Sequence, residues 1–206
     1  MSSHTYPRAT RAAGQQTRRA LLDAAGRLFA ERGLAGVSGA DIAREAGAFP
    51  SQVTYYFGSK EALFVEAACR GVLRTAAAVE RVGASKRSPR SYVRSIVLSA
   101  LDSPALLCFV EATLLVRGRP DLAPRVRETF ERLYLEAERA IAENLAARGW
   151  EIRAEPAAEA RGFWAVLLGV ALEGAARGGP VDRASAEAAV DLVLNLYLDP
   201  DRTSAS

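Results

Sequence analysis

The spacing of hydrophobic residues predicts a helix that begins near Thr17. From there, apolar side chains recur at intervals of three and four residues, which places them on one helical face; they are Leu21, Ala24, Ala25, Leu28 and Phe29. Gly33 supplies a stop signal for this helix. Residues 1–16 have no such period and combine Ser, Thr, Gly and Gln with scattered Arg. We therefore expect a flexible basic arm ahead of the helix.

Two short helices are predicted next. Ser38, followed three positions later by Asp41, is a capping-box pattern, and the helix it opens ends at Gly47. Pro50 fits the first turn of the following helix, because the N–H that proline lacks has no intrahelical partner there. Gly58 ends that helix. Two short helices joined by a turn that contains Gly, and preceded by a longer helix, indicate a helix-turn-helix.

The rest of the chain is also predicted to be helical. Prolines and glycines separate a series of helical segments, at residues 59–81, 89–101, 104–117, 121–148, 156–178 and 184–198. We find no alternating pattern that would indicate a strand. The sequence therefore predicts an all-α protein of about nine helices. Its parts are the arm at 1–16, a three-helix module at 17–63 and a larger helical body at 64–206.

Charge and composition narrow the classes of partner. The formal net charge is +3, but residues 1–60 alone carry a net charge of +4, which leaves −1 for the remainder. This asymmetry favours a polyanion as the partner of the first module, although a merely solvated basic face would give the same charge. Neither Cys69 nor Cys108 has a second cysteine or a histidine at metal-ligand spacing. The longest uncharged apolar run, residues 163–172, is too short to cross a bilayer. We expect no metal, no membrane partner and a cytoplasmic protein.

The pattern of reactive side chains argues against an enzyme. His4 is the only histidine, and it falls in the predicted arm. No Ser or Cys has a base nearby in the pattern, and no Gly-rich phosphate loop follows a strand. We therefore expect neither catalysis nor a cofactor.

The third helix separates into an inner and an outer face at about 100° per residue. The inner face consists of Pro50, Val53 and Phe57, and the outer face and its flanks consist of Ser51, Gln52, Thr54, Tyr55 and Tyr56. A glutamine can pair with adenine through two hydrogen bonds, and a serine hydroxyl can serve several bases. Tyrosine hydroxyls and Lys60 suit phosphates. The plainer alternative is that Tyr56 packs inward and that Tyr55 is an ordinary exposed aromatic.

Residues 17–64 resemble the DNA-binding region of TetR-family (tetracycline-repressor-like) transcriptional regulators. The resemblance rests on LLDAAGRLFAERG, on SGADIA with AG following, and on VTYYFGSKEAL. It implies that the DNA contacts come from Ser38, Gly39, Pro50, Ser51, Gln52, Thr54, Tyr55, Tyr56 and Lys60. It also makes Lys60 the residue that grips a phosphate at the start of the fourth helix. Two positions depart from the family pattern: Thr54 replaces a usual Tyr, and Phe49 replaces a small residue such as Ser. Phe49 leaves the recognition helix without a polar N-cap, so its N–H groups are available to a phosphate.

The last two helices have more apolar surface than one core requires. Residues 163–172 are apolar all round, and residues 189–198 are apolar over roughly 240°, whereas a surface helix needs only about 100°. A fully buried helix in a monomer accounts for the first of these helices but fits the second poorly. The family resemblance also implies a homodimer formed by these two helices. The candidate interface residues are Val166, Val170, Ala189, Val193, Leu196 and Tyr197.

Glu111 stands on an otherwise apolar face of residues 104–117. One interpretation is that Arg94 or Arg117 pairs with it, because an unpaired buried carboxylate is costly. The other is that Glu111 lines an effector cavity and favours a cationic or amine-bearing ligand; Phe109, Phe130, Tyr134 and Trp164 are the candidate apolar walls. Aromatic residues at such spacing also suit an ordinary core.

Taken together, the sequence and the resemblance predict a homodimeric, ligand-responsive regulator. We expect a repressor that binds a pseudo-palindromic site in double-stranded DNA and is released by a small-molecule effector. The alternative is a DNA-binding protein of the same fold that senses no small molecule, with an architectural role or regulation by another protein. A solid helical body would favour the alternative, and a walled cavity would favour the sensor.

Overall fold

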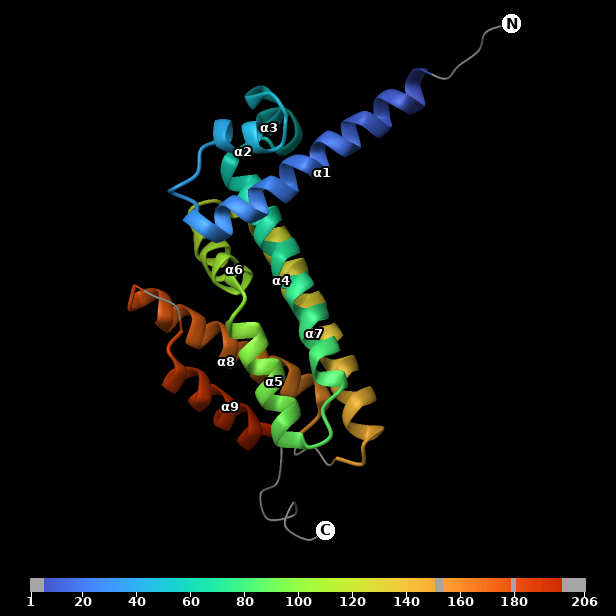
Figure 1. The fold of residues 1–206 in the computed structure, drawn as a ribbon, viewed down its shortest axis with the longest axis vertical. Coiled ribbons are helices and arrows are strands. Elements are labelled where there is room, and N and C mark those ends of the chain that lie inside the picture. Colours follow the sequence, from blue (N-terminus) through green and yellow to red (C-terminus); the bar gives the residue numbers. More distant parts are fainter. Residues whose placement is uncertain (1–5, 151–153, 179–180, 198–206) are drawn as a thin grey trace, which may run out of the picture. The chain divides into compact units, whose positions relative to one another are not determined.

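The computed structural model describes residues 6–150, 154–178 and 181–197, and describes only the backbone of 6–11, 144–146 and 196–197. Figure 1 shows that these residues are helical, with loops between the helices. The helices are α1 Tyr6–Arg32, α2 Gly39–Glu45, α3 Pro50–Phe57, α4 Lys60–Ala84, α5 Pro89–Leu101, α6 Pro104–Leu115, α7 Ala123–Ala146, α8 Pro156–Ala176 and α9 Arg183–Tyr197, with a 3₁₀ turn at Pro120–Leu122. The prediction of an all-α chain with about nine helices is confirmed for this part of the chain.

Two compact units divide the chain, Met1–Ala68 and Cys69–Ser206. We call the first the module and the second the body. The division falls inside α4, five residues later than the boundary at residue 63 that the sequence suggested. In the module, α1 begins at Tyr6, so residues 6–16 are helical where we expected a flexible arm. That segment is rich in Ala, Arg and Gln, which favour helix without needing an apolar face.

The module is built around the apolar face of α1. Leu21, Ala24, Ala25, Leu28 and Phe29, the residues predicted to form that face, are all buried. The rings of Phe29 and Phe64 meet edge to face with centroids 5.0 Å apart. Helix α2 packs against both α1 and α3, and Val53 is the buried residue of α3. These contacts hold two helices that are too short to be stable alone.

The body is organised around α8, which packs against α5, α6, α7 and α9. Its buried residues include Phe163, Trp164 and Leu167. The Trp164 indole Nε1–H donates to the carbonyl oxygen of Leu133 on α7 at 3.2 Å, so its polar atom is satisfied in the interior. Helix α8 is therefore central to the body but not buried all round, because Ala165, Gly169 and Leu172 are exposed.

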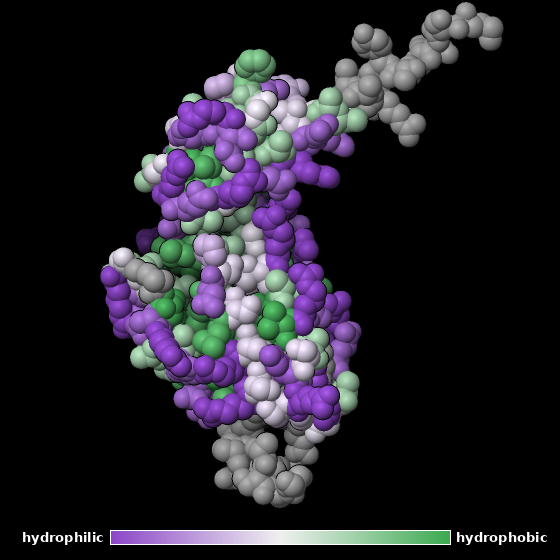
Figure 2. Space-filling view, in the orientation of Figure 1, coloured by the Kyte–Doolittle hydropathy of each residue, from purple (hydrophilic) through white to green (hydrophobic). Residues whose placement is uncertain are grey.

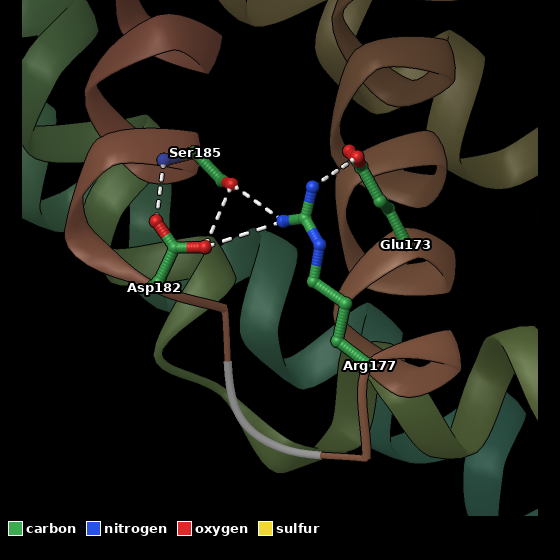
Figure 3. Close-up of polar contacts among 4 residues, drawn as sticks. All are labelled: Glu173, Arg177, Asp182 and Ser185. Atoms are coloured by element: carbon green, nitrogen blue, oxygen red, sulfur yellow. Dashed lines mark hydrogen bonds and ion pairs between the residues drawn. The ribbon is translucent and has the colours of Figure 1, made fainter.

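An arginine fixes the turn between α8 and α9. Figure 3 shows the Arg177 guanidinium between the carboxylates of Glu173, at 2.5 Å, and Asp182, at 3.2 Å. Asp182 accepts the backbone N–H of Ser185 at 2.9 Å, and Arg177 also donates to the Ser185 hydroxyl at 3.0 Å. This cluster joins the end of α8 to the start of α9, so the outer faces of the two helices keep a fixed relation.

Among the described residues, no single helix is long and apolar enough to cross a membrane. Only α5 and α6 taken together, across a bend of 63°, reach that length and composition.

Candidate nucleic-acid interface and ligand cavity

Helix α2 begins with a complete capping box. The Ser38 side chain accepts the Asp41 backbone N–H at 3.1 Å, and the Asp41 carboxylate accepts the Ser38 backbone N–H at 3.0 Å. The Ser38 hydroxyl also donates to Asp41, and Arg44 pairs with it from one turn further on. The hydrogen bonds from Ser38, together with Arg44, lower the pKa of Asp41 to about 2. Ser38 is thus exposed but engaged in its cap, and Gly39 is the first residue of α2.

The side chains of α3 follow the predicted helical period in part: Val53 and Phe57 face inward, but Pro50, which we expected on the inner face, is exposed. Val53 is buried, and Phe57 lies under the Arg18 guanidinium, which is 4.7 Å from its ring centroid. Arg18 also pairs with Glu66 at 2.6 Å. The exposed residues are Pro50, Ser51, Thr54 and Tyr55, while Gln52 and Tyr56 are half-buried. Helix α3 therefore has an outer face that is open to a partner.

The two tyrosines of α3 have different environments. The Tyr55 side chain is 80% exposed and meets the Tyr56 ring edge to face, with centroids 4.9 Å apart. The Tyr56 hydroxyl lies next to α1, because a Cβ placed on Gly14 would come within 3.2 Å of it. Tyr56 is therefore supported by α1, and Tyr55 projects from the module.

Gln52, which the sequence analysis assigned to DNA alone, caps the N-terminus of α3. The N-cap position itself is occupied by Phe49, which is 75% exposed. Its backbone N–H donates to Gln52 Oε1 at 2.9 Å. Glutamine three residues after an N-cap is the second half of a capping box, and that signal was present in the sequence.

Lys60, the first residue of α4, holds the loop between α1 and α2. Its Nζ donates to the carbonyl oxygens of Leu34, at 3.0 Å, and Val37, at 2.9 Å. Sequence reasoning assigned Lys60 to a phosphate and missed this structural role. The two roles are compatible, since an ammonium group has three protons to donate.

The body contains a cavity of about 70 Å³ between α4, α5, α7 and α8. That volume is several times what one water molecule needs. The lining is mostly aliphatic and aromatic, with carboxylates from Glu80 and Glu136 and no basic side chain. The lining residues are Ala76, Val79, Glu80, Pro89, Tyr92, Val93, Ile96, Leu133, Glu136, Ala137, Ala140, Ile141, Phe163 and Trp164.

The two carboxylates that line this cavity are paired with arginines, and its tyrosine is protonated. Glu80 pairs with Arg139 at 3.5 Å, and Glu136 pairs with Arg132 at 3.2 Å. Burial raises the pKa of Tyr92 above its usual value, so its hydroxyl stays protonated and can act as a donor. The cavity can thus accommodate a mainly apolar molecule, and a positively charged or donor group of such a molecule would share the two carboxylates with Arg139 and Arg132.

The five predicted effector residues do not come together at this cavity. Trp164 lines it, but the other four do not. Phe130 stacks between Phe109, at 5.0 Å, and Tyr134, at 5.8 Å, measured between ring centroids. These three rings form an aromatic cluster in which Phe109 is buried and Phe130 and Tyr134 are half-buried.

Glu111 is half-buried and lies outside the cavity lining. Burial raises its pKa. Neither expected pairing, with Arg94 or with Arg117, is among the ion pairs of the described residues, and the Arg94 guanidinium binds Glu187 on α9. Glu111 instead lies near the buried Cys108 thiol, whose pKa is raised to about 11 by burial and by this carboxylate.

The predicted dimer residues need a correction on α9. Ala189 and Val193 are 0% exposed and pack into the body itself; the apolar arc of this helix is broad, and the sequence could not tell which part of it meets the core. Val166 and Val170 on α8 are half-buried. The side chains of Leu196 and Tyr197 lie outside the described residues.

A different set of residues forms the exposed apolar face of these two helices. Leu172 on α8 is 46% exposed, and Leu192 on α9 is 54% exposed. Small exposed residues continue the face along both helices, at Ala165, Gly169, Ala176 and Ala188. We call this set the α8–α9 face. Figure 2 shows hydrophobic surface on the visible side of the body in the region of α6 and α8.

The capped pair of short helices on α1, joined to an all-α body, defines a helix-turn-helix transcriptional regulator. Comparison with known families gives the same class. Residues 21–67 match the family described as bacterial regulatory proteins, tetR family, and residues 89–193 match the bacterial transcriptional repressor C-terminal family. The chain belongs to the TetR family, as the resemblance of residues 17–64 had indicated.

Relatives extend this assignment over most of the chain. The HTH-type transcriptional regulator BetI of Burkholderia ambifaria is 35% identical over 187 residues, which cover 87% of this chain and 93% of that protein. BetI of Burkholderia thailandensis is 33% identical over 193 residues, which cover 90% of this chain and 96% of that protein. These relatives are regulators and not enzymes.

Solved structures show the same fold. A protein described as a transcriptional regulator from Rhodococcus sp. RHA1 is 36% identical, with a TM-score of 0.76 and coverage of 87% of this chain and 94% of that chain. The multidrug binding protein EbrR, solved in complex with imidazole, is 27% identical, with a TM-score of 0.58 and coverage of 90% of this chain and 97% of that chain.

Proposed function

We propose that this protein is a homodimeric, ligand-responsive repressor that binds a pseudo-palindromic operator through α2 and α3. The observation that carries the proposal is the open outer face of α3, with Ser51, Thr54 and Tyr55 exposed on a helix whose inner side is fixed to α1. A recognition helix of this kind fits the major groove. The proposed phosphate contacts are Ser38, Gly39, Tyr56 and Lys60. Because the partner is chromosomal DNA, we expect a cytoplasmic location.

Enrichment of genomic DNA tests the DNA-binding part. Purified protein is mixed with fragmented genomic DNA of the source organism, and the retained fragments are sequenced. We expect a few fragments that share an inverted repeat. Tyr55→Ala should lose this enrichment, whereas Leu135→Ala, at an exposed position on α7, should keep it. Broad retention without a shared repeat would instead support the architectural alternative.

The α8–α9 face supports the homodimer. Two large leucines and four small residues leave an apolar surface that a second copy can cover by two-fold symmetry. Leu192→Arg should give a monomer in sedimentation velocity and weaken operator binding by at least about a hundredfold, since two modules no longer bind together. Leu135→Arg makes the same change at an exposed leucine outside this face and should remain a dimer. A Leu192→Arg dimer with full affinity would contradict the proposed interface.

The cavity supports the sensor over the alternative that binds no small molecule. Its lining favours an apolar ligand with a positively charged or donor group near Glu80 and Glu136. Helix α4 provides a physical link, because it starts in the module at Lys60 and supplies Ala76, Val79 and Glu80 to the cavity. A ligand that favours one position of α4 would change the population of DNA-competent protein.

The sensor is tested by operator release. Small apolar amines are compared with neutral molecules of the same shape, such as benzylamine with benzyl alcohol, for their effect on operator affinity. We expect release by at least one amine and a weaker effect of its neutral match. Equal operator affinity with every compound of a broad panel would contradict the sensor and leave the DNA-binding part intact.

A further inference from the structure

The amide of Gln52 has a fixed orientation. The Phe49 backbone N–H donates to Gln52 Oε1 at 2.9 Å. A backbone N–H can donate only to the oxygen of the amide, so this contact decides which end is Oε1 and which is Nε2. Phe49 has no side-chain acceptor and makes no side-chain cap. Gln52 therefore supplies the cap that the N-terminus of α3 otherwise lacks.

This orientation changes which base Gln52 can read. Pairing with adenine uses both ends of the amide: the oxygen accepts from N6 and the nitrogen donates to N7. In the structure the oxygen already accepts from the Phe49 N–H, so an adenine contact would have to use its second lone pair beside the cap or break the cap. The end of the amide with no hydrogen-bond partner among the described residues is Nε2, which carries two N–H donors.

Guanine is the base that matches a pair of donors. It presents two acceptors, N7 and O6, at the major-groove edge, whereas adenine presents one acceptor and one donor. Helix α3 has the sequence PSQVTYYF and contains no arginine or lysine, the usual readers of guanine. We propose that Gln52 fills that role and selects guanine at one position of each half-site. This replaces the adenine contact expected from sequence, and it rests on the proposed operator binding.

Selection from a random duplex library tests the assignment. Wild type should select guanine at one position that depends on Gln52. Gln52→Glu keeps an oxygen for the Phe49 N–H but removes both donors, so its thermal midpoint should be equal or higher while the guanine preference falls by roughly tenfold or more. The new preference should move toward cytosine, whose N4 amino group can donate to a carboxylate.

A matched control separates charge from base reading. Gln16→Glu makes the same chemical change at an exposed position of α1 and should keep the guanine preference. At the selected position, 7-deazaguanine removes the N7 acceptor; wild type should then lose about tenfold in affinity and Gln52→Glu should lose none.

Each outcome has a separate meaning. Selection of adenine at the Gln52-dependent position, an unchanged preference in Gln52→Glu, or equal binding of 7-deazaguanine by wild type would overturn the guanine assignment while operator binding stands. Failure of wild type to select any sequence would overturn the proposed function itself.

Discussion

The module and the body are stabilised by different kinds of contact. In the module, α2 has seven residues and α3 has eight, and polar groups hold them: a capping box at Ser38, the amide of Gln52 and the ammonium of Lys60. In the body, long helices pack through aromatic and aliphatic side chains around α8. Short helices are not stable alone, so the module needs these polar contacts in addition to its apolar core on α1, whereas the long helices of the body rely mainly on their apolar interior. Polar substitutions should therefore affect the module more.

The largest expected effect comes from removing a core ring in either region. Phe29 is buried in the module and Phe109 in the body. Each Phe→Ala change should lower the free energy of unfolding of its own region by about 3–5 kcal/mol. In hydrogen exchange, Phe29→Ala should expose α1, α2 and α3 while α7 and α8 stay protected, and Phe109→Ala should do the reverse. Simultaneous loss of protection in both regions would show that they unfold as one unit.

Lys60→Met should give the next largest effect. The substitution keeps an apolar stem and removes the donors to Leu34 and Val37, so we expect a loss of about 2–3 kcal/mol. Thermal melting measures it. Lys86→Met changes the chain's other lysine, which lies in the body, and should shift stability by no more than about 0.5 kcal/mol.

Operator binding gives Lys60→Met a second measurement. At a temperature where both proteins are folded, the variant should bind every sequence more weakly, and the slope of log affinity against log salt should fall by about one. If stability falls but the salt slope is unchanged, Lys60 does not contact a phosphate and has only its structural role. That result would sharpen the contrast between the regions, because the lysine would then be a purely internal support of the module.

Filling the cavity should have a smaller effect on stability and a clear effect on function. Ala137 lines the cavity, and Ala137→Leu places apolar atoms in it. We expect a change in stability of no more than about 1.5 kcal/mol, unchanged operator affinity, and loss of release by any amine that acts on wild type. Ala142→Leu, at an exposed position of the same helix, should respond as wild type does. A normal response of Ala137→Leu would place the effector elsewhere.

The sequence predicted the module better than the body for a physical reason. The module's signals are local: the face of α1, the Ser38–Asp41 cap and the two sides of α3 all follow from spacing within a few residues. The cavity takes residues from four helices, at positions from 76 to 164, and no local pattern indicates which side chains will meet. Of the five predicted effector residues, Trp164 lines this cavity, while Phe130 and Tyr134 belong to a neighbouring cluster.

The errors also have local causes. On α9, Ala189 and Val193 differ by one position from the exposed Ala188 and Leu192, and a broad apolar arc does not fix the rotation of a helix to within one residue. At α3, the capping role of Gln52 was readable from its position after Phe49. It was missed because a glutamine predicted on the outer face of the recognition helix was assigned to DNA alone, whereas Gln52 is half-buried.

The smallest expected effect is the acid response of the two helix caps, and it compares the regions directly. The pKa of Asp41 in the module is lowered from 3.8 to about 2, mainly by its bonds to Ser38. The pKa of Asp182 in the body is also lowered, first by the Ser185 N–H. A group with a lowered pKa in the folded state stabilises the protein above its unfolded pKa, and this contribution disappears as pH falls through the folded pKa.

Asparagine variants isolate each cap, since asparagine can still accept an N–H but does not titrate. Wild type should exceed Asp41→Asn in module stability above about pH 4, and the difference should shrink toward zero as pH falls to about 2. Wild type should likewise exceed Asp182→Asn in the stability of the body near neutral pH, and this difference should also shrink as pH falls. Hydrogen exchange of α2 and α9 at several pH values measures both. Because α2 is short and relies on its cap, its protection should fall more than that of α9; a larger loss at α9 would reverse the comparison between the two regions.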